Sequence, residues 1–593
     1  MKLFLKSVRF SLSLVYQSSG LLVFVYFLLS LLGSALGLLS TYALRFLLNA
    51  LSGAQAAASD APIWIAVYVI LLVLTQGNEA FQNILYDSVF KRAEHQYECR
   101  LADKMSALSL SVLDSSVGRD MTDDVRYARN TAVYLVYRLV KIISYACTFA
   151  AAFVVLFQFN FGFSLLFLVL TIPGIVMTFV FDKRADELRR RQAPDVRKFS
   201  YYRWMLTDAW PAKDVRMYDL TEPIKSRYEE VKKEYLAANR RLDKQKLFSL
   251  LFAEAVTRAG EVAFSIYVVY EAVLGRIGIG DVALYIGFAV TAAGAFTEMV
   301  SYAVFAWVRT TAVMGRVFAF FEIENDRPVG KIPISAFETL QFDNVCFKYP
   351  YTNKYILNGV SFTLHRGEKL SIVGVNGSGK STIIKLLLGL YEIESGQILL
   401  NGLPMGDYDI RQVRKLFSAL FQSFAQYPLS LRNNIALSDY DRAGQDAEIE
   451  AALRQGGVYE ELQEKLENGL DSYMTRKFDD SGTELSKGQW QKIALSRAYF
   501  KNAQVLIFDE PSAALDAEAE DRIFQNFETI SEGKTGIMIS HRISAARMAD
   551  RIIVLDGGKI TESGTHEELV AQGGLYARFY NLQKEKYTAG EGA

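Results

Sequence analysis

The sequence predicts a membrane α-helical bundle of six transmembrane helices with long cytoplasmic extensions, followed by an α/β P-loop domain. Long runs without a charged residue, joined by segments that differ sharply in Lys and Arg content, support the bundle. After residue 339, short β-rich runs alternate with helical patterns, which is typical of an α/β domain. The expected boundaries are 1–322 for the bundle, 323–338 for a polar linker and 339–593 for the α/β domain.

The composition agrees with a membrane part joined to a water-soluble part, because 51% of the 593 residues are hydrophobic. The 65 Lys and Arg residues balance 65 Asp and Glu residues, so no global field favours nucleic acid or an anionic partner. Cys99, Cys147 and Cys346 lack the spacing of a disulfide framework or a zinc site. We therefore expect three free thiols.

Uncharged runs give five spans directly. One run of 35 residues lies between Arg9 and Arg45, a second covers 61–78, and a third covers 142–181 and contains two spans joined by the turn FNFG. The fifth span comes from an apolar run that begins with GDVALYIGFAVTAAGAF and continues past Glu298. Each is long enough to supply helices for a hydrocarbon core of about 30 Å. With the doubtful stretch discussed below as the sixth span, the expected helices cover approximately 15–44, 61–80, 131–157, 161–182, 249–275 and 281–310.

Two basic segments between the spans are expected in the cytoplasm. Residues 88–130 hold seven Lys and Arg residues and residues 183–248 hold eighteen, which places both inside by the positive-inside rule. Their charged helical patterns predict arms, and about 25 residues of helix would reach roughly 37 Å. At the far ends lie 113–124 and 210–220, which are either solvated loops or contact surfaces for the α/β domain.

The run KLSIVGVNGSGKSTIIKLLLG places an apolar strand before a P-loop and an apolar helix after it, which makes the motif specific. Its glycines let backbone N–H groups converge on phosphate oxygens, Lys380 neutralises phosphate charge, and the Ser381 hydroxyl is a ligand for Mg²⁺. The motif predicts an ATP site. Its expected residues are Gly374, Asn376, Gly377, Ser378, Gly379, Lys380, Ser381 and Thr382.

Two further motifs suit the same chemistry. VLIFDE is a buried strand that ends in Asp509, expected to bind Mg²⁺ directly or through water, and Glu510, expected to polarise an attacking water. The segment ELSKGQWQKIALSRA combines a serine, a glycine and a helix N-terminus, which also suits a phosphate.

With these motifs in this order, the chain resembles an ATP-binding cassette (ABC) exporter half-transporter of the type IV, or B-type, fold. The resemblance covers nearly the whole chain. It implies a helical subdomain within the α/β P-loop nucleotide-binding domain, ATP and Mg²⁺ as cofactors, and an ATPase coupled to transmembrane transport. It also implies that 113–124 and 210–220 are coupling helices that contact the nucleotide-binding domain.

The resemblance assigns further residues. Tyr349 matches the aromatic that stacks on adenine, Gln422 the glutamine that senses Mg²⁺ and the membrane domain, and His541 the switch histidine on the γ-phosphate. Residues 512–516 (SAALD) match the loop that communicates across the dimer. Ordinary structural roles for Tyr349 and Gln422 remain open.

The signature segment departs from the family pattern at one position. The family has LSGGQ, and this chain has LSKGQ at 485–489. Ser486, Gly488 and Gln489, the expected nucleotide contacts, are kept. Lys487 either adds positive charge beside the phosphates or points to water, and we favour water.

The stretch LFAEAVTRAGEVAFSIYVVYEAV (251–273) is the sixth span by a parity argument. The N-terminus and the nucleotide-binding domain are both expected in the cytoplasm, so the number of crossings is even. Its charges should then face the bundle interior or a wet cavity, since charge in lipid is costly. Glu254 and Arg258 are spaced to pair. The alternative is that both lie in the cytoplasmic extension of the helix.

The expected substrate cavity consists of Glu254, Arg258, Glu261 and Glu298. In the family, each ATP lies between the P-loop of one cassette and the signature of the other, so the resemblance implies a second half-transporter, identical or related, as partner. The bilayer is the other partner, and no nucleic acid is expected. The expected location is the bacterial cytoplasmic membrane.

The resemblance predicts an ATP-driven exporter or flippase for a peptide, a lipid or a drug-like amphiphile. An ATP-gated channel or regulatory ABC protein, and a type IV importer on the same fold, are the alternatives. The predicted spans exclude a soluble cassette protein of DNA repair or translation. We also expect no peptidase domain ahead of the first span.

Overall fold

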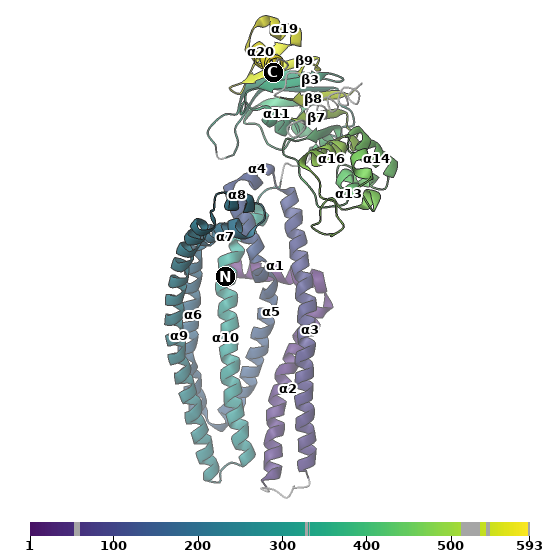
Figure 1. The fold of residues 1–593 in the computed structure, drawn as a ribbon. Helices are drawn as coiled ribbons and strands as arrows, with labels where there is room; N and C mark the ends of the chain where they lie inside the picture. The colour runs from purple at the N-terminus through teal and green to yellow at the C-terminus, as the bar shows by residue number, and fades with distance from the viewer. Residues whose placement is uncertain are drawn as a thin grey trace. The chain divides into compact units, whose positions relative to one another are not determined.

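The computed structural model describes residues 1–52, 60–325, 330, 332–350, 352–510, 534–540 and 546–590. Their contacts divide the chain into two compact units, which are considered separately (Figure 1). Unit 1 comprises Met1–Ser106 and Asp120–Ile323, and unit 2 comprises Ala107–Arg119 and Glu324–Ala593. Residues 107–119 therefore group with the part of the chain that carries the P-loop.

Unit 1 is built from long helices, coloured purple to teal in Figure 1. The long ones are α2 (Leu21–Leu51), α3 (Ala61–Ala107), α5 (Ser116–Phe159), α6 (Phe161–Arg191), α9 (Thr221–Val273) and α10 (Ile279–Glu322). The shorter ones are α1 (Lys2–Ser19), α7 (Ala193–Thr207) and α8 (Ala212–Met217).

Five helices are long and apolar enough to cross a membrane in the part of the chain that the structure describes, namely α2, α3, α5, α6 and α10. These are the five spans that uncharged runs predict. Helix α9 is one continuous helix of 53 residues that packs along α6, but its charges keep it out of this group. The count of six crossings stays a prediction.

The predicted first span, 15–44, has the wrong limits, because it joins the ends of two helices. Gly20 separates α1 from α2 with a φ of 48°, in the left-handed region that glycine adopts without steric cost. The uncharged run continues through this break, so hydropathy does not detect it. Helix α2 then extends to Leu51.

The FNFG turn lies where the sequence predicts it. Asn160 separates α5 from α6, and its side-chain oxygen accepts a hydrogen bond from the Phe163 N–H at 3.1 Å. This N-cap satisfies a backbone donor that has no partner inside the helix. At the other end of α6, Gln192 separates it from α7, so the predicted arm is interrupted.

The first expected coupling segment, 113–124, is not one short element. The five-residue helix α4 (Leu110–Asp114) covers only the first two residues of this segment, and α5 covers the segment from Ser116 onward. Ser115 makes the break: its hydroxyl donates to the Val112 carbonyl at 2.6 Å and accepts from the Gly118 N–H at 2.8 Å. The second expected segment, 210–220, contains the short helix α8.

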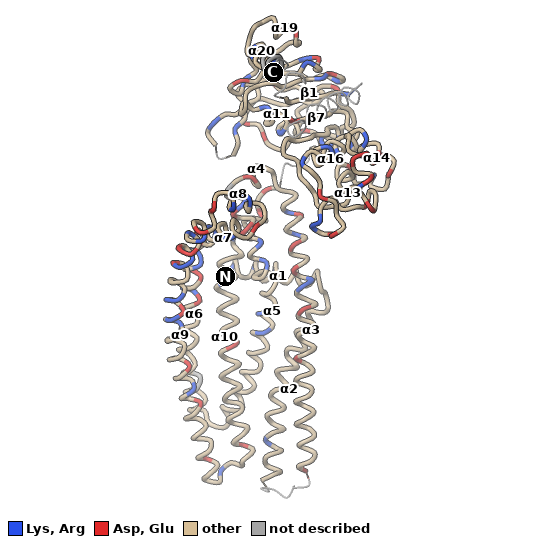
Figure 2. The backbone as a smooth tube through the Cα atoms, in the orientation of Figure 1, with Lys and Arg blue, Asp and Glu red and all other residues tan. Residues whose placement is uncertain are grey.

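Figure 2 shows how charge is distributed along unit 1. Lys, Arg, Asp and Glu gather on α7, α8 and the adjoining parts of α6 and α9, while α2 and the far parts of the other helices are mostly uncharged. Such segregation is typical of helices that extend from a bilayer into water.

Unit 2 contains two β-sheets, as the alternating pattern predicts. The antiparallel sheet has the order β2-β1-β4-β5, formed by β1 (Thr339–Phe347), β2 (Leu357–His365), β4 (Ser395–Leu400) and β5 (Leu403–Pro404). The second has the order β10-β9-β3-β8-β7-β6 and is parallel except for β10. Its strands are β3 (Lys369–Gly374), β6 (Phe417–Leu420), β7 (Val505–Asp509), β8 (Thr535–Ile539), β9 (Arg551–Asp556) and β10 (Lys559–Gly564).

Helices complete unit 2 around several hydrophobic clusters. One cluster joins the two sheets to α11 through residues such as Phe342, Leu370 and Ile384. Another lies beneath α13, α14 and α16 and contains Ile435 and Trp490, which is the predicted helical subdomain. The helices are α11 (Lys380–Leu387), α12 (Ile410–Leu416), α13 (Leu431–Ala436), α14 (Asp446–Gln455), α15 (Tyr459–Gln463), α16 (Lys487–Phe500), α19 (His566–Gln572) and α20 (Leu575–Gly590), with 3₁₀ turns at Met405–Asp407, Tyr440–Arg442 and Gly469–Asp471.

Candidate active site

The P-loop connects the carboxyl end of β3 to the first turn of α11. At Gly374 a Cβ atom would lie 2.2 Å from the Leu555 carbonyl oxygen on β9, so no other residue fits without displacing that strand. Gly379 has a φ of 109°, a conformation that residues with a side chain rarely adopt. Both glycines are therefore required by the backbone path of the loop.

Lys380 places its ammonium group inside the loop. Its Nζ donates to the carbonyl oxygens of Gly374 at 2.9 Å and Val375 at 3.0 Å. Burial lowers the pKa of Lys380, and the nearby Glu510 and Asp509 carboxylates oppose that effect. The Ser378 hydroxyl is buried and has no hydrogen-bond partner among the described residues. A cation and a free hydroxyl in one glycine-lined loop fit a phosphate group.

Ser381 and Asp509 bring two oxygens together at the edge of the loop. The Ser381 hydroxyl donates to Asp509 Oδ1 at 3.1 Å, and Asp509 is 4% exposed. Burial raises the pKa of the Asp509 carboxyl, whereas the Ser381 hydrogen bond lowers it. A hydroxyl and a carboxylate side by side are ligands that Mg²⁺ accepts, so this pair fits the ion.

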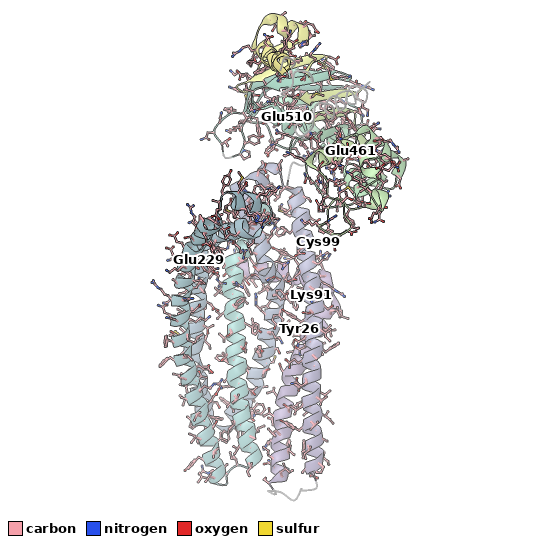
Figure 3. The ribbon with its side chains drawn as sticks, viewed as in Figure 1. Tyr26, Lys91, Cys99, Glu229, Glu461 and Glu510 are labelled. Carbon is pink, nitrogen blue, oxygen red and sulfur yellow. The ribbon has the colours of Figure 1, made fainter. Side chains whose placement is uncertain are left out.

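Glu510 follows β7 and is held by the neighbouring strand. Its backbone N–H donates to the Ile539 carbonyl of β8 at 3.0 Å, and its φ is 53°, in the left-handed region. Its Oε2 accepts a hydrogen bond from Gln422 Nε2 at 2.6 Å. Because β3 and β7 flank β8 in one parallel sheet, their carboxyl ends bring Glu510 to the same edge as the P-loop. Figure 3 labels Glu510.

Tyr349 lies beside the first turn of α11. Its hydroxyl is 3.1 Å from Thr382 Oγ1 and accepts from Lys385 Nζ at 3.3 Å. Its ring meets Tyr391 edge to face, with centroids 5.3 Å apart. The Tyr391 hydroxyl in turn donates to the Asp114 carboxylate at the end of α4. No local motif predicts this contact, because its partners are 277 positions apart in sequence.

The signature segment forms the N-terminus of α16. The Ser486 hydroxyl accepts from the Gln489 N–H at 3.2 Å, and the Gln489 side-chain oxygen accepts from the Ser486 N–H at 3.1 Å. This capping box fixes the start of the helix. Gly488 lies within its first turn, and Lys487 is exposed. Exposure agrees with the expectation that Lys487 points to water in this chain.

Two groups of predicted residues lie outside the described residues. These are His541 and the segment 512–516.

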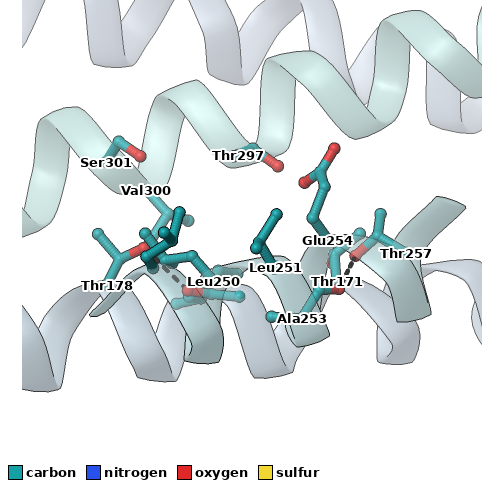
Figure 4. Close-up of a pocket in the computed structure, with 13 residues that line it drawn as sticks. Thr171, Thr178, Leu250, Leu251, Ala253, Glu254, Thr257, Thr297, Val300 and Ser301 are labelled. Atoms are coloured by element: carbon teal, nitrogen blue, oxygen red, sulfur yellow. Dashed lines mark hydrogen bonds between the residues drawn. The ribbon is translucent and has the colours of Figure 1, made fainter. Parts of the chain in front are cut away.

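The predicted pair of Glu254 and Arg258 on α9 is confirmed. Arg258 Nε is 2.9 Å from Glu254 Oε1, and Arg258 Nη1 is 2.7 Å from Glu261 Oε2. Glu254 also lines a cavity of about 380 Å³ formed by α6, α9 and α10, where its carboxylate points toward α10 near Thr297 (Figure 4). Arg258 and Glu261 are not among the residues that line this cavity.

Glu298, the fourth predicted cavity residue, lines a different cavity of about 490 Å³ in unit 1. Arg138 and Arg309 line it as well, and sequence reasoning did not single them out. The signal was present, because both arginines fall inside predicted spans, where ionisable residues usually mark a functional site.

Comparison with known proteins identifies the family. Residues 23–296 match the ABC transporter transmembrane region, and residues 357–513 match the ABC transporter family. The subtilin transport ATP-binding protein SpaT of Bacillus subtilis is 31% identical over 93% of this chain and 89% of its own length. The nisin transport ATP-binding protein NisT of Lactococcus lactis subsp. lactis is 26% identical over 87% of this chain and 86% of its own.

Other relatives match a smaller part of the chain. An ATP-dependent lipid A-core flippase of Haemophilus ducreyi is 37% identical over 46% of each chain. Among solved structures, a bacterial Atm1-family ABC exporter with ATP bound has the same fold, with a TM-score of 0.79, 22% identity, and coverage of 95% of this chain and 98% of its own.

The matches account for both units, since a helical membrane region precedes an ATP-binding α/β domain. Such proteins bind nucleotide, are embedded in a membrane, and couple ATP hydrolysis to export or flipping. The chain is a half-transporter of the exporter type and belongs to the ABC transporter family.

Proposed function

We propose that the chain exports an amphipathic peptide, working as a dimer with a second copy or with a related half-transporter. One observation favours a peptide over a lipid or a drug-like compound. The peptide exporters for subtilin and nisin align with this chain over 89% and 86% of their own length, whereas the lipid A-core flippase aligns over 46% of its own length. Cargo recognition depends on the membrane region, so relatives that match along most of the chain are the more informative ones.

In the proposed dimer, each ATP lies between two chains. The P-loop amides and the Lys380 ammonium hold the phosphates, and the Tyr349 ring stacks on the adenine. Ser486, Gly488 and Gln489 of the partner subunit close the site from the other side. The exposure of Ser486 at the N-terminus of α16 supports this role, because a helix N-terminus favours an anion.

Ser381, Gln422 and Asp509 are the proposed holders of Mg²⁺, which supplies positive charge to the phosphate oxygens when it is bound. The Glu510 carboxylate accepts a proton from the attacking water, and the Gln422 amide, 2.6 Å away, orients that carboxylate. His541 is the proposed contact to the γ-phosphate. Metal binding, proton transfer and phosphate binding are thus assigned to different side chains of one site.

The proposed topology has six crossings, with α9 as the fifth span in chain order. The N-terminus and the domain at 339–593 then lie in the cytoplasm of a bacterial cell, joined by the linker at 323–338 to the membrane domain at 1–322. The charge concentrated on α7, α8 and the neighbouring helix ends supports this orientation (Figure 2).

Uptake by inverted membrane vesicles tests the proposed export. Vesicles that contain the full chain should accumulate a dansyl-labelled amphipathic peptide when ATP is added. Vesicles with the Glu510→Gln chain should accumulate none above background, because binding without turnover does not drive repeated transport. ATP-dependent flipping of a labelled phospholipid without any peptide uptake would contradict the proposed cargo class.

A second prediction concerns the link from α4 to the aromatic pair beside the P-loop. Asp114→Asn is expected to lower the ratio of peptide-stimulated to basal ATP turnover about fivefold, the equivalent of about 1 kcal/mol for one hydrogen bond. Tyr391→Phe should have the same effect, because it keeps the ring against Tyr349 and removes only the hydroxyl.

The double variant separates a shared contact from two unrelated defects. If Asp114 and Tyr391 act through one hydrogen bond, the double variant is no worse than either single variant. Asp103→Asn changes an exposed carboxylate on α3, outside both expected coupling segments, and serves as the control. Additive losses in the double variant would show that this hydrogen bond does not couple peptide binding to ATP turnover.

A further inference from the structure

The cavity of about 490 Å³ in unit 1 has an unusual distribution of charge. We call it the arginine cavity, after Arg138 of α5 and Arg309 of α10, which line it together. Both guanidinium groups lie over the ring of Phe305, with their central carbons 4.2 Å and 5.0 Å from its centroid. Two helices distant in sequence thus bring two permanent positive charges to one aromatic ring.

Neither arginine is neutralised within the described residues. No acidic side chain in that part of the chain lies within 4.0 Å of either guanidinium group, and Arg138 Nη1 is buried without a hydrogen-bond partner. Two acids act electrostatically on the Arg309 guanidinium group from a greater distance, and both already have partners: Asp182 pairs with Lys246, and Asp186 pairs with Arg190. Like charges held together without counter-charges are costly, and an anion would relieve that cost.

Most of the remaining wall of the arginine cavity is aromatic, and Asn130, Ser301 and Glu298 complete it. Tyr137 and Tyr302 line it with ring centroids 6.1 Å apart, and Tyr86 meets Tyr137 at 4.9 Å. Such rings offer flat apolar faces with hydroxyl groups at their edges, which suits apolar side chains attached to a polar backbone. Glu298 is the one acidic residue among those lining the cavity, so the two arginines leave it with a net positive charge.

We propose that the arginine cavity binds a carboxylate of the amphipathic peptide cargo, which rests on the proposed function. The planar guanidinium forks of Arg138 and Arg309 hold the carboxylate oxygens, and the tyrosine rings and Phe305 contact the apolar side chains next to it. A carboxylate removes the uncompensated charge and gives Arg138 Nη1 an acceptor. Glu298 disfavours a second anion and limits the cavity to one acidic group.

Equilibrium binding to the purified full chain tests the proposal without requiring transport. The probe is a dansyl-labelled heptapeptide of alternating Leu and Gln in two forms, one with a free C-terminal carboxylate and one with a C-terminal amide. The two forms differ by one negative charge. We expect the carboxylate form to bind about tenfold more tightly, as for one hydrogen-bonded ion pair.

The variants assign that difference to the two arginines. Arg138→Gln and Arg309→Gln should each reduce the tenfold preference to about threefold, and the double variant should abolish it. Arg126→Gln is the matched control: it makes the same substitution at an exposed arginine of α5 that does not line the cavity, so the preference should stay tenfold. Size-exclusion chromatography and binding of a fluorescent ATP analogue establish that each variant is folded.

Three results would overturn the proposal. The first is a preference that persists in the double variant, and the second is an equal loss in Arg126→Gln. The third is displacement of the carboxylate peptide by dodecyl phosphate at concentrations ten times lower than by unlabelled peptide, which would assign the cavity to a lipid phosphate. Vesicles that fail to take up the peptide while the preference behaves as expected would contradict the proposed export and support the cavity's assignment.

Discussion

Replacing Glu510 by glutamine is expected to preserve ATP binding and to reduce ATP turnover about 100-fold or more. Loss of a general base typically costs two to four orders of magnitude. Glutamine has the same shape and keeps an oxygen that accepts from Gln422 Nε2, so the surroundings of the site are retained. The measurement is phosphate release by the purified chain, with nucleotide binding measured in parallel.

Glu567→Gln is the matched control for Glu510→Gln. Glu567 is an exposed acid in the first turn of α19, which follows the antiparallel strand β10 and so begins at the opposite edge of the sheet. The variant makes the same substitution and the same change of charge away from the P-loop edge. Parental turnover in the Glu510→Gln chain would exclude Glu510 as the group that activates water.

Replacing Lys380 by alanine is expected to weaken ATP binding itself, by about 100-fold. The change removes the cation at the centre of the P-loop, and two or more charge-assisted hydrogen bonds of about 1.5 kcal/mol each account for that loss. Because the ammonium bonds to the Gly374 and Val375 carbonyls, the variant also loses contacts that shape the loop. Titration with a fluorescent ATP analogue measures the dissociation constant.

Lys559→Ala provides the comparison for Lys380→Ala. Lys559 is exposed on β10 of the same sheet, so its removal tests the effect of one lost positive charge on the domain as a whole. Its affinity for the analogue should remain within about twofold of the parent, as for most surface substitutions. Unchanged affinity in the Lys380→Ala chain would be incompatible with the proposed phosphate site.

The nucleotide site was predictable from sequence because its parts are local. A strand, a glycine-rich loop and a helix place Lys380 and Ser381 by short-range geometry alone. To predict that Asp509 lies 3.1 Å from Ser381, one further fact is needed, namely that β3 and β7 belong to the same parallel sheet. Hydrophobic periodicity and strand-terminal acids together supply that fact.

The membrane unit was predictable as a set of spans but not in its details. Gly20 interrupts an uncharged run, and the hydropathy of that run is the same whether it forms one helix or two. The convergence of Arg138 and Arg309 on Phe305 depends on which faces of α5 and α10 meet. That choice is made by side-chain packing between helices, which leaves little trace in the sequence of either one.

The left-handed backbone of Glu510 has a consequence for how this sequence was selected. The other described non-glycine residues with positive φ are Asp219, Asn344, Asn401 and Asn502, and Asp and Asn are the residue types with a side chain that adopt this region most readily. A glutamate lacks that tolerance, and the conformation costs it about 1 kcal/mol. Selection for folding alone would favour glycine or asparagine at position 510. The chain therefore keeps a carboxylate at the end of β7 against its own folding preference.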